Sequence, residues 1–372
     1  MCTATPLTSQ ILAQRNSISG ILEFNPIRDL GPHFDEDGDS FYLMSDVKDA
    51  KGRAFTVLFN QLFIYRSPLG PIAQLAISIF DESTKEYHFG EITYFLPLVA
   101  DGNTIALSST NPISQTILDV AMPEGRLYGT MDAMYVEACG DDVLGFSMRM
   151  EAHGPILSNL VTGVIPFGGG VDWEYAIPQM ETSGTLIVHG ETYDVKGTSW
   201  FDRQWGRFGP YKWTWMGIKL DNGVTMSLWD QQGMNLNPDS FLSTPGKSVP
   251  GERAFVTILD PNGSLTVADV NVTGSARWTS PNSKRVYPTR WKVVIPSKQA
   301  TLEVNLLAQY QEISSPVGTS RMEGKAAVAG TYDKGKVKGC TIVEMFNLFP
   351  LFSGAYGGPL PLPPNGQTRI VL

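Results

Sequence analysis

The residues of this chain that are best suited to chemistry lie in one short segment, residues 197–206, which reads Gly-Thr-Ser-Trp-Phe-Asp-Arg-Gln-Trp-Gly. A β-strand there would carry two faces, with Trp200, Asp202 and Gln204 on one and Phe201, Arg203 and Trp205 on the other. Burial beside an indole and an amide favours the protonated form of a carboxyl group, because the charged form loses its hydration. We therefore expect Asp202 to be a buried acid group in an apolar pocket.

Other interpretations of the same residues stay open. Asp202 and Arg203 could form a structural ion pair at the end of a strand, although alternating faces would keep the two side chains apart. Glu174 and Asp230 are the alternative acids.

Tryptophans are concentrated around this segment, since six of the eight lie between residues 173 and 229. Large aromatic side chains could line a binding site for an apolar ligand such as a polyene or an isoprenoid. The candidates are Trp173, Tyr175, Trp200, Trp213, Trp215 and Trp229. Spacing alone fits ordinary packing in a β-sheet interior at least as well.

The surrounding sequence predicts short strands separated by turns. Residues 53–65 form the clearest strand, and its polar interruptions Asn60 and Gln61 are either hydrogen-bonded core residues or substrate contacts. Asn222-Gly223 predicts a hairpin between residues 211–220 and 224–231. A two-residue turn there places Leu220 opposite Thr225 and Trp215 opposite Asp230. Trp213, Trp215 and Asp230 would then share a face. Further strands are expected at 75–80, 91–98, 129–138, 144–150, 184–190, 254–259, 264–271, 290–295, 300–307 and 322–329.

The fold class follows from this pattern. No segment shows a sustained helical period, and many short strands with Gly, Pro and Asn turns are typical of all-β barrels or sandwiches. A chain of 372 residues exceeds a typical single core, so we expect two domains, residues 1–208 and 209–372. Residues 1–16 are expected to be a loose arm, and residues 233–252 a long polar loop that is either a lid or an excursion between strands.

Composition excludes several classes of partner. The net charge is −9 without a basic cluster, which argues against nucleic acid and anionic membrane surfaces. No signal peptide and no apolar run of about 18 residues is present, so we expect an intracellular, cytoplasmic protein without an integral membrane segment. The three cysteines are expected to be isolated thiols, and the oligomeric state is left open.

The sequence also predicts neither a metal nor a cofactor. Its four histidines, His33, His88, His153 and His189, show no ligand spacing typical of a metal site. Residues 168–170 do not form a dinucleotide fingerprint, and no phosphate-binding loop is present. Serine hydrolysis is rejected because no histidine follows His189 and no nucleophile elbow occurs.

Residues 197–206 resemble the signature of the hydroxyneurosporene synthase family, the AttH-type proteins with tandem lipocalin-like domains. In that family a Trp or Tyr, one further residue, an Asp, a basic residue, a Glu and a Trp follow a Gly that ends a strand. The resemblance includes the upstream aromatic pair Trp173 and Tyr175 before Pro178. It also includes the downstream aromatic strand and its Asn-Gly hairpin. Fungal decalin-forming Diels–Alderases are similar in architecture.

The resemblance implies two tandem lipocalin-like β-domains with a ligand site near their junction. It assigns Asp202 as the proton donor, with Trp200 and Tyr175 as aromatic neighbours that stabilise a cation. Trp173 stands where the hydratases have a histidine, and Gln204 replaces the usual glutamate. Both differences favour isomerisation or cyclisation over addition of water.

These observations predict a cofactor-independent isomerase or cyclase that acts on a hydrophobic natural product, namely an isoprenoid, a polyketide or a prenylated alkaloid. The alternatives are a carotenoid-type hydratase, a Diels–Alderase without proton transfer, and a lipocalin-like protein that binds an apolar ligand without reaction. The expected catalytic residues are Asp202, Trp200 and Tyr175. The expected substrate-binding residues are Trp173, Glu174, Arg203, Gln204, Trp213, Trp215, Trp229, Asp230 and Asn60.

Overall fold

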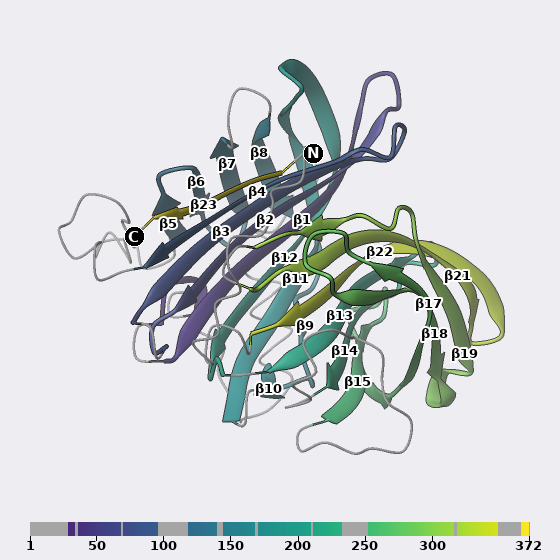
Figure 1. The fold of residues 1–372 in the computed structure, drawn as a ribbon. Coiled ribbons are helices and arrows are strands. Elements are labelled where there is room, and N and C mark those ends of the chain that lie inside the picture. The colour runs from purple at the N-terminus through teal and green to yellow at the C-terminus, as the bar shows by residue number, and fades with distance from the viewer. Residues whose placement is uncertain are drawn as a thin grey trace, which may run out of the picture. The chain divides into compact units, whose positions relative to one another are not determined.

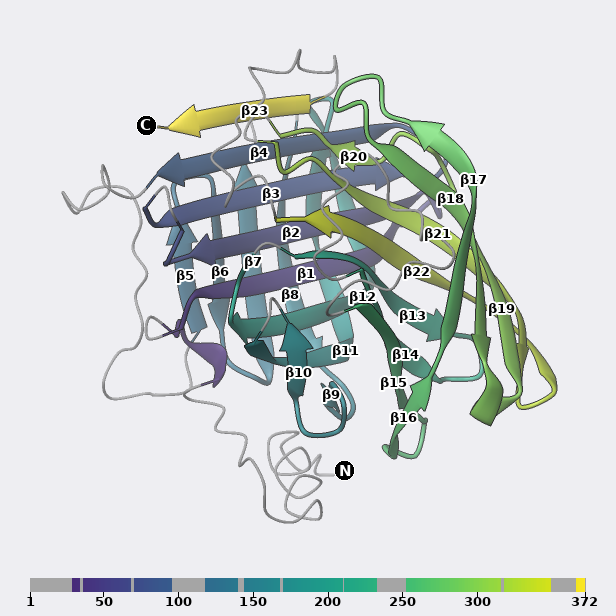
Figure 2. The same ribbon diagram turned by 60° about the horizontal axis from the view of Figure 1, so that its bottom comes forward.

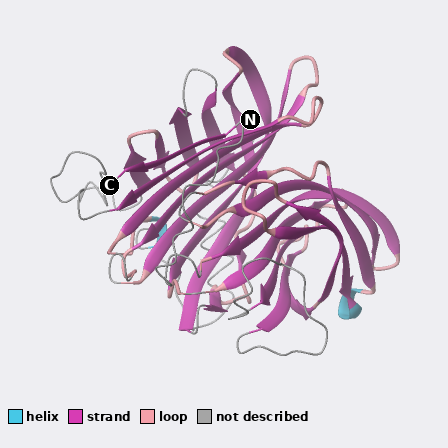
Figure 3. Ribbon diagram, in the orientation of Figure 1, coloured by secondary structure: helices cyan, strands magenta, loops and turns pink. Residues whose placement is uncertain are grey.

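A computed structural model describes residues 29–33, 36–67, 70–95, 118–139, 144–167, 170–209, 211–232, 252–315, 318–348 and 366–371. The expected N-terminal arm and the loop at 233–251 lie outside these residues. Nearly all regular structure in the described part is β-strand (Figure 3). The fold is all-β, with two curled antiparallel sheets, as the sequence predicts (Figure 1). No helix in the described ranges has the length and apolarity needed to cross a membrane.

The described chain divides into two compact units. The first contains the described residues up to Ile156, Trp173–Gly206 and the C-terminal residues from Arg369 onward. The second contains Leu157–Asp172 and the described residues from Arg207 to Thr368. The first sheet has the strand order β23-β4-β3-β2-β1-β12-β11-β8-β7-β6-β5 (Figure 2). Its strands are β1 (Gly38–Asp49), β2 (Ala54–Ile64), β3 (Ile72–Asp81), β4 (Tyr87–Phe95), β5 (Leu118–Met122), β6 (Gly125–Gly129), β7 (Ala133–Cys139), β8 (Leu144–Ala152), β11 (Gly170–Val188), β12 (Glu191–Gly206) and β23 (Gly366–Val371).

The second sheet has the order β16-β15-β14-β13-β22-β21-β19-β18-β17, with β20 beside β21. Its strands are β13 (Lys212–Leu220), β14 (Thr225–Gln232), β15 (Glu252–Leu259), β16 (Leu265–Asp269), β17 (Asn271–Thr279), β18 (Val286–Ile295), β19 (Ala300–Leu306), β20 (Glu312–Ile313), β21 (Arg321–Tyr332) and β22 (Gly335–Asn347). The short strands β9 (Leu157–Ser158) and β10 (Val164–Phe167) and the 3₁₀ turn η2 (Pro296–Lys298) complete the described elements.

Each unit has its own apolar core. In the first unit, alternate residues of β2 enter the core, among them Phe55, Val57, Phe59 and Phe63. In the second, Met216, Ile218, Met226 and Leu228 from β13 and β14 do the same. The period-two pattern of residues 53–65 is therefore confirmed as a strand with one face in the core.

The hairpin between β13 and β14 exists, but its expected register is wrong by one residue. Lys219 lies opposite Thr225, so Trp215 faces Trp229 and Thr214 faces Asp230. The turn has three residues rather than two. Leu220 N–H donates to the carbonyl of Val224, and Gly223 takes a φ of +84°, as in a type I turn that is followed by a left-handed glycine.

The pairing of β1 with β12 fixes the candidate site. Its register runs without interruption from Gly38 opposite Gly206 to Asp49 opposite Val195. Gly197 lies opposite Val47, and a Cβ atom at Gly197 would lie 1.9 Å from the carbonyl oxygen of Asp46. The two backbones approach so closely there that only glycine fits.

Candidate active site

Strand β12 carries the two faces that the sequence predicts. Phe201 and Trp205 belong to the core of the first unit, and the Arg203 guanidinium lies over the rings of Phe41 and Trp205, on the same side. Trp200 and Asp202 lie on the other face, where the indole N–H donates to Asp202 Oδ1 at 2.8 Å. The alternation of side chains along residues 200–205 is thus confirmed.

Asp202 is buried, with an exposed fraction of 6%. Among the described residues no basic group forms an ion pair with its carboxyl. Burial raises the pKa of Asp202 from 3.8 to about 8, and the hydrogen bond from Trp200 opposes part of that rise. A carboxyl group of this kind keeps its proton at neutral pH and can donate it.

The face that carries Asp202 is polar as well as buried. Asp202 lies opposite Tyr42, and Tyr42 lies opposite Asn60. The same row continues across β3 and ends at Glu91 in β4. Directly opposed residues share a face of a sheet, so Asp202, Tyr42, Asn60 and Glu91 lie in one row. Ala76 is the member of this row in β3.

A second polar row runs beside the first. Its polar members are Gln204, Ser40, Gln74 and Thr93. The amide of Gln74 donates to Thr93 Oγ1 at 3.1 Å. Asn60 bridges the two rows, because its amide nitrogen donates to Ser40 Oγ at 3.1 Å. The predicted residues Asp202, Gln204 and Asn60 are therefore brought onto one face, together with Ser40, Tyr42 and Glu91, which sequence reasoning missed.

The Arg203 side chain contacts a different set of residues, on the core side of the sheet. Its guanidinium forms a fully buried ion pair with Asp39 and also contacts His33 Nδ1 at 2.8 Å. Burial alone would raise the pKa of Asp39, but the charge of Arg203 and the hydrogen bonds from His33 lower it on balance. Tyr65 O–H donates to Asp39 at 2.8 Å. The alternative of an ion pair between Asp202 and Arg203 is thereby excluded.

The upstream aromatic pair lies with Arg203 rather than with Asp202. Trp173 stacks on Trp205 at 6.2 Å, and Tyr175 meets the same ring edge-on at 6.2 Å. Tyr175 also belongs to the apolar core. Glu174 stands between them in β11, so alternation turns its buried side chain to the other face of the sheet, the face of Asp202.

The second unit holds the other predicted aromatic residues. Trp213 and Trp229 pack 6.1 Å apart, and Phe167 lies within 6 Å of both rings. The indole N–H groups of Trp213 and Trp229 are buried and have no hydrogen-bond partner among the described residues. Trp215 differs, because its indole donates to Ser227 Oγ at 3.0 Å.

Asp230 does not share this face. It lies opposite Thr214, whereas Trp215 lies opposite Trp229, so the expected grouping of Trp213, Trp215 and Asp230 is wrong. The three-residue turn described above is the physical reason, since one extra loop residue moves every side chain of the partner strand to the other face.

A model of the AttH-like family matches residues 23–347 of this chain. Dehydratase asqC of Emericella nidulans is 27% identical over 211 residues, which cover 55% of this chain and 58% of the dehydratase. Kievitone hydratase of Fusarium solani subsp. phaseoli is 25% identical over 267 residues, which cover 66% of this chain and 70% of the hydratase. The chain thus spans less than two thirds of the length of the dehydratase it matches.

Two crystal structures share the fold. Kievitone hydratase from Nectria haematococca superimposes with a TM-score of 0.69 at 22% identity, covering 87% of this chain and 93% of the hydratase. A putative AttH protein from Nitrosomonas europaea gives a TM-score of 0.69 at 18% identity, covering 88% and 97%. The family match over residues 23–347 confirms the expected resemblance to AttH-type proteins, and the two structures confirm the fold.

Proposed function

The chain belongs to the AttH-like family, and from this premise we propose that it is a cofactor-independent enzyme that protonates an apolar small molecule with the carboxyl group of Asp202. The observation that carries the proposal is the state of this carboxyl. It is buried, it has no ion pair among the described residues, and its pKa is raised to about 8. An acid with a pKa near the working pH is well matched to general acid catalysis.

The first candidate reaction is isomerisation or cyclisation of an alkene. The O–H bond of Asp202 breaks as a new C–H bond forms, which leaves a carbocation beside the carboxylate. The cation then loses a different proton, with or without ring closure, and that proton returns to the carboxylate. The indole of Trp200 lies against Asp202 and can stabilise the cation. Gln204 carries an amide, which cannot accept a proton from water.

The second candidate is reversible addition of water, and the names of the relatives favour it. One relative is a dehydratase and the other a hydratase. In this reaction water adds to the same carbocation and its extra proton returns to a carboxylate. Glu174, buried on the same face in the neighbouring strand, supports this candidate as a second carboxyl group.

The proposed substrate class rests on the residues beside Asp202. The Trp200 indole offers a large apolar surface, and the polar side chains on the same face can fix the orientation of a ligand. We therefore propose an isoprenoid, a polyketide or a prenylated alkaloid as substrate. Holding such a flexible molecule in one conformer lowers the entropic part of the barrier.

Turnover in isotopically labelled water tests the proposal. An extract of producing cells that lack the gene supplies the substrate, which mass spectrometry identifies as the metabolite consumed when purified protein is added. In D₂O, isomerisation or cyclisation through Asp202 places deuterium on a product carbon. Hydration places deuterium on carbon and takes ¹⁸O from labelled water. A product that has the same mass as the substrate and carries neither label indicates a pericyclic reaction and overturns the proposal.

Asp202→Asn provides the matching variant. Turnover should fall about 10²- to 10⁴-fold, the usual contribution of a general acid, while substrate binding is retained. Asp194→Asn is the control, because Asp194 lies exposed on the same strand. Unchanged turnover in Asp202→Asn refutes the role of this carboxyl. A ligand that co-purifies unchanged, with no turnover in wild type, indicates a carrier instead.

A further inference from the structure

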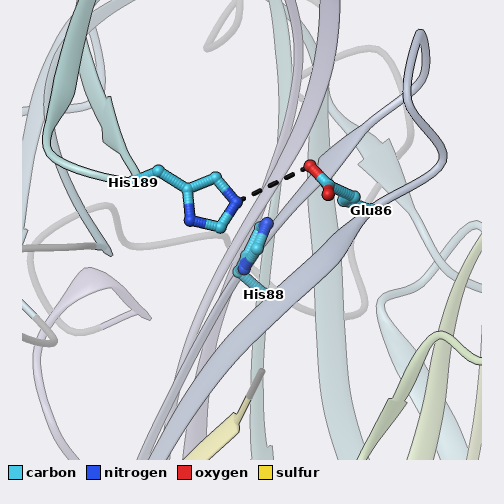
Figure 4. Close-up of side chains that lie close together, drawn as sticks. All are labelled: Glu86, His88 and His189. Atoms are coloured by element: carbon cyan, nitrogen blue, oxygen red, sulfur yellow. Dashed lines mark ion pairs between the residues drawn. The ribbon is translucent and has the colours of Figure 1, made fainter. Parts of the chain in front are cut away.

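Three potential metal ligands from distant parts of the sequence come together in the first unit. Glu86 precedes β4, His88 lies in β4, and His189 lies in the turn between β11 and β12. One ligand atom from each lies within 4.8 Å of the others. His189 Nε2 is 3.6 Å from Glu86 Oε2, and the two imidazole rings are 4.4 Å apart and nearly perpendicular. Figure 4 shows the ring of His88 directed at the gap between the other two groups.

The buried member of the cluster lacks a partner. His88 has an exposed fraction of 6%, and its Nε2 forms no hydrogen bond with any described residue. Buried polar atoms in folded proteins are nearly always hydrogen-bonded, so an orphaned ring nitrogen calls for an explanation. A ligand that this nitrogen binds directly would supply one.

The other two members are held by local structure while they stay accessible. His189 has a φ of +53° and Gly190 a φ of +77°, so both occupy the left-handed region that a two-residue hairpin turn demands. Thr84 Oγ1 donates to the Glu86 carboxylate at 3.2 Å. The side chains of His189 and Glu86 are 53% and 47% exposed, which leaves them room to rotate.

We propose that Glu86, His88 and His189 bind a divalent metal ion of the zinc class through two imidazole nitrogens and one carboxylate oxygen. Bond lengths of roughly 2.0–2.2 Å in a tetrahedral zinc site put ligand atoms about 3.3 Å apart. Rotation of the two exposed side chains toward the fixed His88 achieves this contraction. The fourth position stays open to water or to another ligand.

The bound ion would cross-link two turns of the first unit, one before β4 and one before β12. Because the folded unit would bind the ion more tightly than the unfolded chain, the ion would stabilise the fold. The site shares no residue with the proton-transfer machinery proposed above. Its failure and the failure of the proposed function are therefore distinguishable.

Zinc titration of the full chain, without an affinity tag and after removal of metal by a chelator, tests this site. Calorimetry should detect one saturable site, and cobalt should give the visible absorption of a four-coordinate ion. His189→Asn and Glu86→Gln should each weaken binding by about tenfold or more, since even changes around metal ligands cost that much. Asparagine tolerates the left-handed turn position, so His189→Asn is expected to fold.

His153→Gln is the matched control. His153 lies 3.4 Å from Glu181 on the same unit and is similarly exposed, but it belongs to no three-ligand group among the described residues. This variant should bind zinc as tightly as wild type does. Zinc should raise the unfolding temperature of wild type and of His153→Gln, but it should leave the unfolding temperature of His189→Asn unchanged. The proposal is overturned by the absence of saturable binding in wild type, by binding that survives His189→Asn, or by equal loss in His153→Gln.

Discussion

Asp39 and Asp202 lie on neighbouring strands of one sheet, but their surroundings shift their pKa values in opposite directions. Both are buried, with exposed fractions of 0% and 6%. Asp39 lies opposite Trp205 on the core side, where Arg203 and His33 lower its pKa. Asp202 lies opposite Tyr42 on the other face, where burial raises its pKa to about 8.

The difference shows that burial alone does not decide the charge of a carboxyl group. A guanidinium and several hydrogen-bond donors keep Asp39 ionised in the core, whereas a single indole N–H does not offset the lost hydration of Asp202. The two groups also act on stability at opposite ends of the pH scale. Asp39 contributes stability that is lost as pH falls through its lowered pKa. Asp202 contributes stability that is lost as pH rises toward about 8.

Removing the charge of Asp39 should have the largest effect. Asp39→Asn leaves the guanidinium of Arg203 buried without its counter-charge, and breaking a buried pair costs about 3–5 kcal/mol. Urea denaturation at pH 7 measures this loss.

Asp37→Asn is the control for that measurement. Arg66 and Asp37 form an ion pair 3.2 Å apart in which the arginine side chain is 63% exposed. Exposed pairs contribute roughly 0–1 kcal/mol. Equal losses of unfolding free energy in the two variants would show that Asp39 does not compensate the buried charge of Arg203.

Asp202→Asn should change the dependence of stability on pH. The folded protein holds a proton on Asp202 up to about pH 8, whereas the unfolded chain releases it near the ordinary value of 3.8. Stability of wild type should therefore fall by about 2 kcal/mol between pH 6 and pH 8 because of this group. The difference between wild-type and variant unfolding free energies isolates that contribution. Parallel curves over this range would show that the pKa of Asp202 is not raised.

Trp200→Phe should have the smallest effect and the most specific one. It removes the hydrogen bond to Asp202 Oδ1, which costs about 1 kcal/mol and moves the pKa of Asp202 further upward. The pH-dependent fall in stability should then continue to a higher pH than in wild type. Trp215→Phe removes a comparable indole bond, to Ser227, and should lower stability without moving that transition. Identical pH curves for the two variants would contradict the coupling of Trp200 to Asp202.

The local features of the site were predictable from sequence because they depend on neighbouring residues. Alternation along residues 200–205 places Asp202 and Arg203 on opposite faces without knowledge of any other strand. Of the two interpretations of Gln61, the structure agrees with the hydrogen-bonded core residue, because its amide donates to the carbonyl of Val120 at 3.3 Å. The all-β class followed from many such short patterns.

The partners across strands were not predictable, because they depend on register and on contacts between distant segments. The Asn222-Gly223 pair fits two loop lengths, and the structure adopts the longer one. Tyr42 and Glu91 join Asp202 only through the pairing of successive strands. His88 and His189 are too far apart in the chain to show any ligand spacing, although their rings lie 4.4 Å apart.

Gly197 affects how β12 pairs with β1, and this pairing decides which face of the sheet carries Asp202. Because a side chain there would collide with the Asp46 carbonyl, this glycine permits the close approach of β12 to β1 in the observed register. A shift of the β12 register by one residue would exchange the two faces of the strand. The Arg203 guanidinium would then lie on the face that Asp202 now occupies, and the Asp202 carboxyl would lie in the apolar core. The position of the buried Asp202 carboxyl therefore depends on a residue without a side chain, five positions earlier in the chain.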